Sequence, residues 1–376
     1  MCLGTHQHIA WRLYKILRTS HQITLLVSDD VYDAIEQRVG ITEHTHCLIK
    51  AKQESLYSYL RRVHKENHKI PDFVVNVGMY HSYSIGYLLH YIFNTDSRLL
   101  VYINRANSWM GPLPRYNTSV RLRTIVKKNI EALAQRIALS RFDGILVELP
   151  TIESYIRSEL GYTKTPVRTF QPTYLLGANE GQHCDFTRFV IPGSVTSIRR
   201  DYDTIVEILH DLTNKHSSKF QITFLGRVKD DRFINKFESL ISKGCKLQYY
   251  PTNQWIPPEE FEKQMSSSDV VLLPQKYKKS ELFNGIYGRT GGTGGVSEAI
   301  MHAKPIILPN HFPNVEWIET STIWYNGRTD LHQIMRSIIE DSEWFRELKE
   351  EAKINSQAFK LDDQSAKFTK LLHELH

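Results

Sequence analysis

The sequence of 376 residues is poor in cysteine and contains no long apolar run. Its four cysteines are scattered, and no two of them form a C-x-x-C pair. This spacing argues against a disulfide framework and against a cysteine-based zinc site, and it fits a reducing compartment. The longest apolar runs, such as Ile23–Val27, have the length of a strand. A membrane-spanning helix needs about 20 apolar residues, so we expect no membrane span.

Other signals are missing as well. The first eight residues have neither a basic stretch nor an apolar stretch, so we expect no secretory signal and a cytoplasmic protein. The sequence shows no fixed-period repeat and no low-complexity tract. No recognised nucleic-acid-binding motif occurs, and the net charge of +6 is modest for a chain of this length, so nucleic acid is not an expected partner.

The positive charge lies in the first half of the chain. Residues 1–172 carry a net charge of +8, and the remaining 204 residues carry −2. The span Arg98–Lys128 has seven basic residues and no acidic one. We expect this half of the chain to bind an anionic group. For the span Arg98–Lys128 two interpretations are open: a peripheral contact with an anionic membrane, or an ordinary solvated helix face. In the first case Tyr102, Trp109 and Tyr116 would lie at the membrane interface; in the second the aromatic residues pack inside the protein.

Apolar, β-branched runs recur along the whole chain, and helix-like stretches separate them. These runs are nearly continuous, which is typical of parallel strands covered on both faces. Strands are expected at 23–28, 46–51, 73–78, 99–104, 144–149, 167–171, 189–192, 221–225, 246–250, 270–274, 305–309 and 322–325. Helical periodicity is clearest at 9–18, 119–140, 203–214, 259–267 and 296–302. The pattern predicts an α/β fold with two doubly wound, Rossmann-like domains whose ligand lies at the carboxyl ends of the strands.

The domain boundaries follow from where this pattern pauses. We expect an N-terminal domain at 1–172, a linker at 173–188, a C-terminal domain at 189–340 and a helical tail at 341–376. A doubly wound domain usually opens with a full strand, but here the turn Gly4-Thr5 follows after only three residues. The first strand is therefore short, missing or supplied from elsewhere.

The most informative segment runs from Gly288 to Pro309, where a glycine-rich loop leads into a short helix and then a strand. Residues without side chains let a ligand approach the backbone, and the amides at a helix start favour phosphate. Glu298, in the first turn of the helix, is placed to accept hydrogen bonds from a ribose diol. The alternative is a plain connector with a favourable first-turn acid. The loop residues of interest are Thr290, Gly291, Gly292, Thr293, Gly294 and Gly295.

Arginines follow the first strand of the second domain. Arg199 and Arg200 come after the turn at Gly193, and Gly226-Arg227 ends the next strand. Guanidinium groups at such turns suit bidentate phosphate contacts, although solvated arginines are the simpler interpretation. The segment Asp201-Tyr202-Asp203 opens a helix, where Asp201 is expected to be an N-cap and a metal site is not expected.

Taken together, these motifs resemble the donor domain of GT-B glycosyltransferases and are most similar to glycosyltransferase family 4. The resemblance is good over residues 189–310 and topologically consistent over 1–172. It implies transfer of a sugar from a nucleotide-sugar with retention at the anomeric carbon, without an essential metal or other cofactor. The tail resembles the last helix of that fold, which crosses back to the first domain.

The resemblance also implies site residues. Arg200 or Arg199 matches the basic residue that binds phosphate, and Glu298 matches the second glutamate of the family's Glu-x7-Glu motif. The first glutamate falls at Thr290, which departs from the pattern and leaves the donor sugar open. Nearby residues that would replace it are Lys278, Lys279 and Glu281.

The first domain is expected to hold the acceptor, a glycan or a lipid-linked sugar. The turn Gly4-Thr5-His6 follows the short first strand, and His81 follows a buried strand. The place where the family often has a histidine reads Asn104-Arg105. For His6 and His81 the competing interpretation is an ordinary polar loop residue. We therefore predict that the catalytic residues are Arg200, Glu298 and His81. The residues predicted to bind the acceptor are Gly4, Thr5, His6, His81 and Arg105.

The sequence therefore predicts a glycosyltransferase of the hexosyltransferase type. Two alternatives stay open. One is a sugar-nucleotide epimerase on the same fold, which needs an acid/base pair near the sugar. The other is a degenerate, non-catalytic member that binds a glycan or a partner protein.

Overall fold

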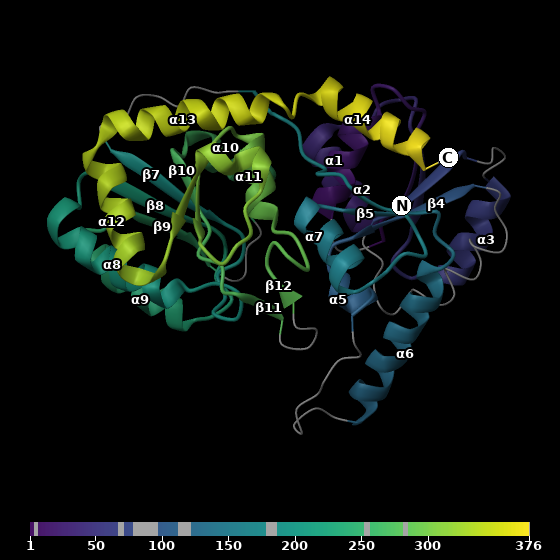
Figure 1. Cartoon of the computed structure of the whole chain (residues 1–376), viewed down its shortest axis with the longest axis horizontal. Helices are drawn as coiled ribbons and strands as arrows, with labels where there is room; N and C mark the ends of the chain where they lie inside the picture. Colours follow the sequence, from purple (N-terminus) through teal and green to yellow (C-terminus); the bar gives the residue numbers. More distant parts are fainter. Residues whose placement is uncertain are drawn as a thin grey trace. The chain divides into compact units, whose positions relative to one another are not determined.

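The computed structural model describes residues 1–3, 7–66, 71–77, 97–111, 122–177, 186–251, 256–280 and 285–375. The chain divides into two compact units (Figure 1). Unit 1 contains Met1–Pro172, Glu281–Gly292 and Asp362–His376, and unit 2 contains Thr173–Ser280 and Thr293–Leu361. The chain thus passes between the two units four times.

Unit 2 is built around a six-stranded sheet in which every pairing is parallel, in the order β14-β13-β10-β7-β8-β9. Its strands are β7 (Thr187–Pro192), β8 (Phe220–Arg227), β9 (Leu247–Tyr250), β10 (Val270–Leu272), β13 (Ile306–Pro309) and β14 (Thr322–Tyr325). In chain order this is the doubly wound arrangement, whose direction of winding reverses between the first strand, β7, and the fourth, β10.

Helices cover both faces of this sheet. They are α8 (Tyr202–His216), α9 (Arg232–Ser242), α10 (Pro258–Ser267), α11 (Gly294–Met301), α12 (Gly327–Glu340) and α13 (Ser342–Gln357), with a 3₁₀ turn at Glu316–Ser321 and a short strand β11 (Lys278–Ser280). The core is rich in aromatic residues. Phe224 stacks on Phe237 with ring centroids 4.3 Å apart, and Tyr202 packs on both Phe224 and Phe233. These rings fix α8 and α9 on the sheet.

Unit 1 has a second parallel sheet. Its strands are β1 (Thr24–Ser28), β2 (His46–Lys50), β3 (Phe73–Val77), β4 (Arg98–Ile103), β5 (Gly144–Val147) and β6 (Val167–Thr169). They form a β1-β2 pair and a β3-β4-β5-β6 group, all parallel. The short strand β12 (Gly285–Ile286) also belongs to this unit.

The first two residues of the chain join the two parts of this sheet. Cys2 forms parallel bridges to both Val27 and Val77. Its amide donates to the carbonyl of Leu26 at 3.0 Å, and the amide of Val77 donates to the carbonyl of Met1 at 2.7 Å. Cys2 therefore takes the place of the short first strand, and unit 1 has the same doubly wound order as unit 2.

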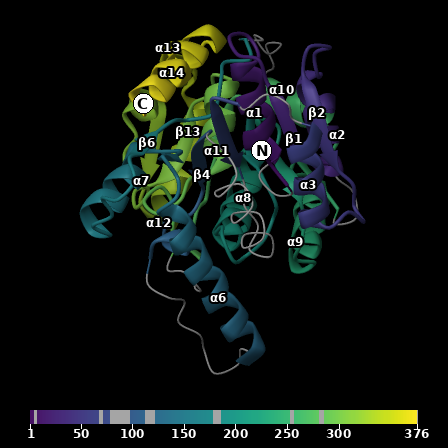
Figure 2. The ribbon, with the colours of Figure 1, turned by 90° about the vertical axis from the view of Figure 1, so that its right-hand side faces the viewer.

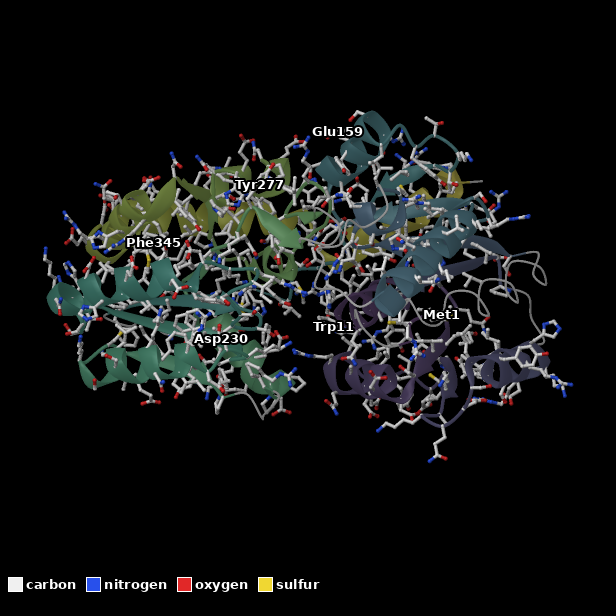
Figure 3. All side chains as sticks on the ribbon, turned by 90° about the horizontal axis from the view of Figure 1, so that it is seen from below. Met1, Trp11, Glu159, Asp230, Tyr277 and Phe345 are labelled. Atoms are coloured by element: carbon white, nitrogen blue, oxygen red, sulfur yellow. The ribbon has the colours of Figure 1, made fainter. Side chains whose placement is uncertain are left out.

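The helices of unit 1 are α1 (Gln7–Leu17), α2 (Asp29–Val39), α3 (Leu56–Glu66), α5 (Ala106–Trp109), α6 (Leu122–Leu139), α7 (Pro150–Ser154) with a π turn at Tyr155–Glu159, and α14 (Leu361–Glu374). Figure 2 shows α14 and α6 from a second side. The last helix is bound by Phe368, whose ring meets Phe170 edge to face at 4.8 Å. Side chains over both units are drawn in Figure 3, where Trp11 marks α1 and Phe345 marks α13. None of the helices in the described ranges is both long and apolar enough to cross a membrane.

The predicted fold class is confirmed. All twelve expected strands are present, and β14 has the expected bounds. The five helices expected from periodicity are also present, with ends that differ by a few residues at most.

Candidate functional site

The winding of unit 2 reverses between β7 and β10, and two loop segments meet there. The segment Arg199–Asp201 runs beside the segment that follows β10. Arg200 forms an antiparallel bridge with Gln275, and the amide of Asp201 donates to the carbonyl of Pro274 at 2.8 Å. Ligands of doubly wound sheets bind at this reversal, outside the carboxyl ends of the strands. The candidate site of unit 2 is therefore centred on these two segments.

Two glycines let the strand ends approach each other. Gly193 has φ of 102°, which strains any side chain, and a Cβ there would lie 2.8 Å from the Arg200 guanidinium. A Cβ at Gly226 would lie 2.2 Å from the carbonyl of Gly193. Both predicted glycines are thus required by contacts inside the protein. The prediction that they also adjoin a ligand is not tested by this geometry.

The two arginines differ. Arg200 is buried, and its Nη1 donates to the Tyr202 hydroxyl at 3.1 Å and to the carbonyl of Gly193 at 3.5 Å. Burial raises the pKa of Tyr202, against the opposing effect of Arg200, so this phenol stays neutral. Arg199 is exposed. The guanidinium of Arg200 is therefore fixed at the strand end, whereas that of Arg199 lies in solvent.

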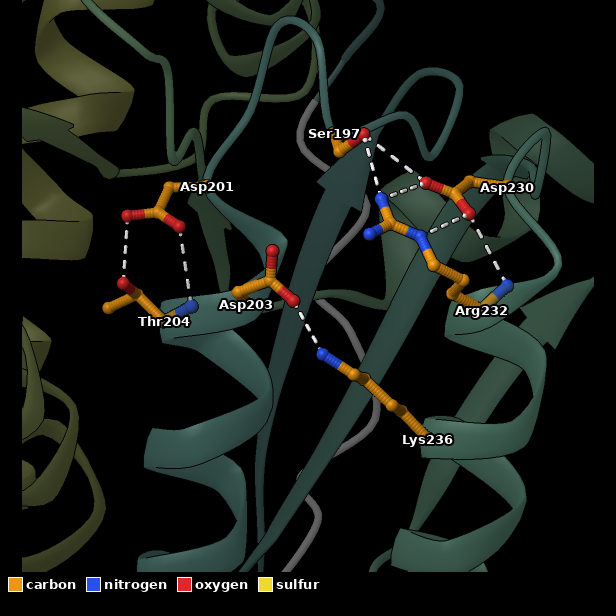
Figure 4. A network of polar contacts seen from close by, with 7 residues as sticks. All are labelled: Ser197, Asp201, Asp203, Thr204, Asp230, Arg232 and Lys236. Atoms are coloured by element: carbon orange, nitrogen blue, oxygen red, sulfur yellow. Dashed lines mark hydrogen bonds and ion pairs between the residues drawn. The ribbon is translucent and has the colours of Figure 1, made fainter.

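The segment Asp201-Tyr202-Asp203 forms no paired carboxylate site (Figure 4). Asp201 caps α8, accepting from the Thr204 amide at 3.3 Å and from its hydroxyl at 2.7 Å. Asp203 pairs instead with Lys236, at 2.5 Å. In the same view Asp230 accepts from Arg232, which holds the pKa of this carboxyl at about 2. No cluster of three or more metal-ligating side chains is found within the described ranges.

The glycine-rich loop ends at the start of α11, where Thr293 is the N-cap residue. The Thr293 hydroxyl accepts from Nε2 of Gln275 at 3.1 Å, which ties the helix start to the segment after β10. Within the described part of the chain, the buried Oε1 of Gln275 has no hydrogen-bond partner. A Cβ at Gly294 would meet nothing within 4 Å, whereas one at Gly295 would lie 2.5 Å from Leu273. The backbone is therefore open at Gly294 and closely packed at Gly295.

Glu298 lies one turn into this helix. Its Oε2 is 4.0 Å from Nε2 of His302, and Glu262 Oε2 is 3.1 Å from the same nitrogen. The His302 side chain is only 3% exposed, whereas that of Glu298 is 14% exposed. The predicted contact of Glu298 with ribose stays a prediction, and Glu262 is a comparable carboxylate beside the same histidine.

The first half of the glycine-rich loop belongs to unit 1. The Thr290 hydroxyl accepts from the Ile286 amide at 2.8 Å and donates to its carbonyl at 3.2 Å. The Thr290 carbonyl accepts from the amide of Ala106 at 2.8 Å, and Arg289 pairs with Glu159 at 2.6 Å. Thr290 is buried, so its side chain holds the turn. Thr290 was predicted to lie at the donor, and the two hydrogen bonds of its hydroxyl with Ile286 do not test that prediction, which stays open.

Sequence reasoning missed Glu148, which directly follows β5. It is 7% exposed, and its Oε2 would lie 1.6 Å from a Cβ added at Gly292. Gln171 Nε2 donates to its other oxygen at 3.3 Å. The charge of Glu148, together with burial, raises the pKa of Tyr102, with burial as the larger cause. A buried carboxylate thus lies against the glycine-rich loop. The sequence does carry one signal, an acidic residue directly after an apolar strand, but it does not indicate the contact with Gly292.

Several predicted acceptor residues are outside the described residues: Gly4, Thr5, His6 and His81. In the sequence, Gly4 to His6 follow Cys2 and Leu3, and His81 comes four residues after the end of β3. Arg105 is described and half-buried. It precedes α5, and its carbonyl accepts from the Ser108 hydroxyl at 2.9 Å. The side chains of Lys278 and Lys279 and the whole of Glu281 also lie outside the described part.

The predicted membrane contact through Arg98–Lys128 needs correction in its aromatic part. Tyr102 and Trp109 are 3% and 6% exposed, so neither lies at an outer surface of unit 1. Arg98 opens the buried strand β4 and donates to the carbonyl of Leu375. Tyr116 is outside the described residues. Arg227 is half-buried at the end of β8, as expected for its place in the chain.

Comparison with known proteins gives structural matches only. No family model and no curated protein matches the sequence. The fold is shared with a glycosyltransferase from Rickettsia africae (TM-score 0.60, 12% identity, 100% of this chain and 97% of that one). A trehalose-6-phosphate synthase studied for glycosyl transfer with retention matches with TM-score 0.63 at 9% identity, covering 99% and 98%. A UDP-GlcNAc 2-epimerase from Neisseria meningitidis, bound to UDP-GlcNAc, matches with TM-score 0.57 at 14% identity, covering 99% and 98%. At these identities the matches establish the GT-B fold.

Proposed function

We propose that this protein is a glycosyltransferase that moves a sugar from a nucleotide-sugar to a glycan or glycolipid acceptor. The observation that carries the proposal is the construction at the winding reversal of unit 2. There a buried arginine, a helix start with an open glycine and an amide oxygen of Gln275 that has no partner among the described residues adjoin two strand ends. Such a place favours a diphosphate and its nucleoside.

Each group has a role in the proposed reaction. Arg200 and the amides at the start of α11 stabilise the negative charge that develops on the departing diphosphate. Glu298 accepts hydrogen bonds from the ribose hydroxyls. The bond between the anomeric carbon and the phosphate oxygen breaks, the acceptor oxygen bonds to the same carbon, and its proton goes to the leaving phosphate. A retaining course without a metal is part of the proposal, and the trehalose-6-phosphate synthase likeness supports the retaining course at the level of fold.

The first experiment is a thermal-shift panel with UDP, GDP, ADP, CMP and their sugar conjugates. We expect one nucleotide to stabilise the wild type, by about 2.7 kcal/mol at a hundred times its dissociation constant. Glu298→Gln and Arg200→Ala are expected to abolish this shift. The sugar conjugate that gives the largest shift then becomes the donor in an acceptor screen.

Two variants of the same unit serve as matched controls. Glu262→Gln changes the other carboxylate beside His302, and Arg328→Ala removes an arginine that pairs with Glu207 and Asp211 on helix faces. Both are expected to keep the nucleotide shift. If no nucleotide stabilises the wild type, or if the controls lose the shift as fully as the site variants do, the donor-site proposal fails.

A second candidate, a sugar-nucleotide epimerase, is favoured by one observation. Glu148 is a buried carboxylate beside the glycine-rich loop, and an epimerase needs an acid/base group close to the sugar. The two activities separate without any acceptor: an epimerase converts the donor sugar and exchanges its proton with deuterated water, whereas a transferase needs the acceptor. A protein that binds the nucleotide but does neither is the degenerate member.

A further inference from the structure

Helix α6 of unit 1 exposes a stripe of aliphatic side chains. Val126, Ile130, Leu133 and Ile137 are 50%, 53%, 57% and 62% exposed. Single exposed aliphatic residues are common, but four on one helix are not. Their spacing of four, three and four residues places them on one face, about 16 Å long at 1.5 Å per residue. We call this face the α6 stripe.

The opposite face of the helix packs on unit 1. Ala132, Gln135, Ala138 and Leu139 are buried there, and the Arg136 side chain donates to the carbonyl of Gly111. The α6 stripe is therefore not a misplaced core face, because the helix already has its packing side. Figures 1 and 2 show α6 extending away from the other labelled elements of unit 1.

The charged residues near the α6 stripe indicate which kind of partner it binds. Arg123 is exposed and lies at one shoulder of the stripe, and the exposed Arg141 follows in the turn just after the helix ends at Leu139. The sequence has a further basic residue, Lys127, four positions after Arg123. The helix contains one acidic residue, Glu131, which the helical period places away from the stripe. An aliphatic face with a basic shoulder is the pattern of helices that lie in the interface of an anionic membrane.

A second copy of this chain fits less well. The spacing puts Ile130 and Ile137 at the first and Val126 and Leu133 at the fourth position of a heptad. Within the helix the flanking positions, which decide pairing in a coiled coil, are then Lys127, Asn129, Ala134 and Arg136. Two copies of this helix would bring basic residues together, and none of these four positions carries an acid to match them. Charge complementarity therefore selects an anionic surface.

We propose that the α6 stripe docks this protein on the surface of an anionic lipid bilayer. The aliphatic side chains enter the boundary between headgroups and acyl chains, and the basic shoulder lies over acidic headgroups. The inference is independent of the proposed sugar transfer, and it moves the predicted contact from the buried aromatic residues to α6.

The test is co-sedimentation of the full chain with vesicles of phosphatidylcholine and phosphatidylglycerol at a ratio of 7:3, and with phosphatidylcholine alone. We expect binding to the anionic vesicles, with affinity about tenfold or more above the neutral ones, and its loss at 0.5 M NaCl. Ile137→Asn is expected to weaken binding roughly tenfold. Its matched control is Ile354→Asn, because Ile354 is also a helical isoleucine and is 63% exposed.

A second pair of variants covers the case in which Ile137→Asn fails to fold. Arg123→Gln with Arg141→Gln removes charge without touching the stripe, and Arg346→Gln, on α13, is its control. We expect the double variant to bind the anionic vesicles several-fold more weakly, and the control to bind them as the wild type does. The proposal is overturned by equal binding of wild type and both variant sets. It is also overturned by a dimer, seen in sedimentation velocity without lipid, that Ile137→Asn dissociates.

Discussion

At the scale of single residues, the glycines of the segment 288–295 are needed for different physical reasons. Gly292 leaves room for the Glu148 carboxylate, Gly295 leaves room for Leu273, and Gly294 faces open space. We therefore predict that Gly292→Ala destabilises the protein by about 1–3 kcal/mol, because the new methyl group overlaps Glu148. Gly294→Ala, its matched control, should be neutral or slightly stabilising, because alanine loses less chain entropy on folding. Urea unfolding measures both.

A double-mutant cycle identifies the contact behind this cost. Glu148→Ala removes the carboxylate that meets residue 292, so Gly292→Ala should cost less in that background than in the wild type. We expect a coupling free energy above about 0.5 kcal/mol between the two changes. If the two changes in unfolding free energy were strictly additive, residue 292 would not be in contact with Glu148. The pair Gly294→Ala and Glu148→Ala should be additive, which tests the specificity of the cycle.

The sequence shows that this segment is rich in glycine, but it does not show which neighbouring atoms require a residue without a side chain. A glycine makes space either for a ligand or for other atoms of the protein, and the sequence alone does not distinguish these two reasons. Gly226 and Gly295 turn out to meet protein atoms, so their presence alone is weak support for a ligand. Glu148 was missed for a related reason. Its neighbour Gly292 is distant in sequence, and only the fold brings the two together.

At the scale of elements, the strands were predictable because each one satisfies a local rule. A parallel strand buried on both faces is a short apolar run, and Val270–Leu272 and Ile306–Pro309 are fully buried. The bridge at Cys2 obeys no such rule, since one residue carries no period. It is recognisable only from its hydrogen bond to Leu26 and its bridges to Val27 and Val77. The short helix α5 and the π turn after α7 were likewise beyond the reach of periodicity.

The joint between α11 and β13 contains a half-buried lysine. Lys304 Nζ donates to the carbonyl of Ser266 at 2.9 Å, and burial lowers its pKa to about 8, against the opposing charge of Asp269. In the unfolded chain the pKa of lysine is about 10.4. Below pH 8 the lysine is protonated in both states and burial of its charge costs stability. Between pH 8 and 10.4 the unfolded state binds more protons, so this contribution to the free energy of unfolding rises with pH.

We predict that Lys304→Met removes this rise. The free energy of unfolding of the wild type minus that of Lys304→Met should increase by up to about 3 kcal/mol between pH 8 and pH 10.4. Urea titrations at several pH values measure it, and contributions from tyrosines and cysteines cancel in the difference. Lys349→Met is the control, because Lys349 also lies near Asp269, at 3.5 Å, but is 38% exposed. A flat difference for Lys304→Met, or an equal rise for both variants, would contradict the assignment.

At the scale of the whole molecule, the two units are not continuous in sequence. The segment 281–292 and the last helix belong to unit 1, although both follow the start of unit 2. The sequence pattern predicts a helical tail but not the residues on which it packs. The unit to which a helix belongs depends on long-range contacts, such as that of Phe170 with Phe368. The hydrogen bond of Ser20 with Ser365, at 2.6 Å, is a second contact between the last helix and the first 172 residues.

This organisation predicts that a change near the carboxyl end destabilises the part of the protein formed mainly by the first 172 residues. Phe368 is fully buried against unit 1, and Phe368→Ala should cost about 3–5 kcal/mol there. We expect hydrogen exchange of the β3, β4 and β5 amides to accelerate roughly a hundredfold or more, while the β7 and β8 amides change little. Mass spectrometry of peptic fragments resolves these strands.

Phe345→Ala is the reciprocal control. Phe345 lies only 23 residues earlier in the chain and is 5% exposed in the core of unit 2. Its loss should accelerate exchange in β7 and β8 and spare β3 to β5. If both variants accelerated exchange equally in all five strands, the two units would unfold as one, and stability would not follow the division of the chain. If each variant loosens its own sheet, then packing and not sequence distance decides which residues share a unit, and the thermal-shift panel reports on unit 2 separately from unit 1.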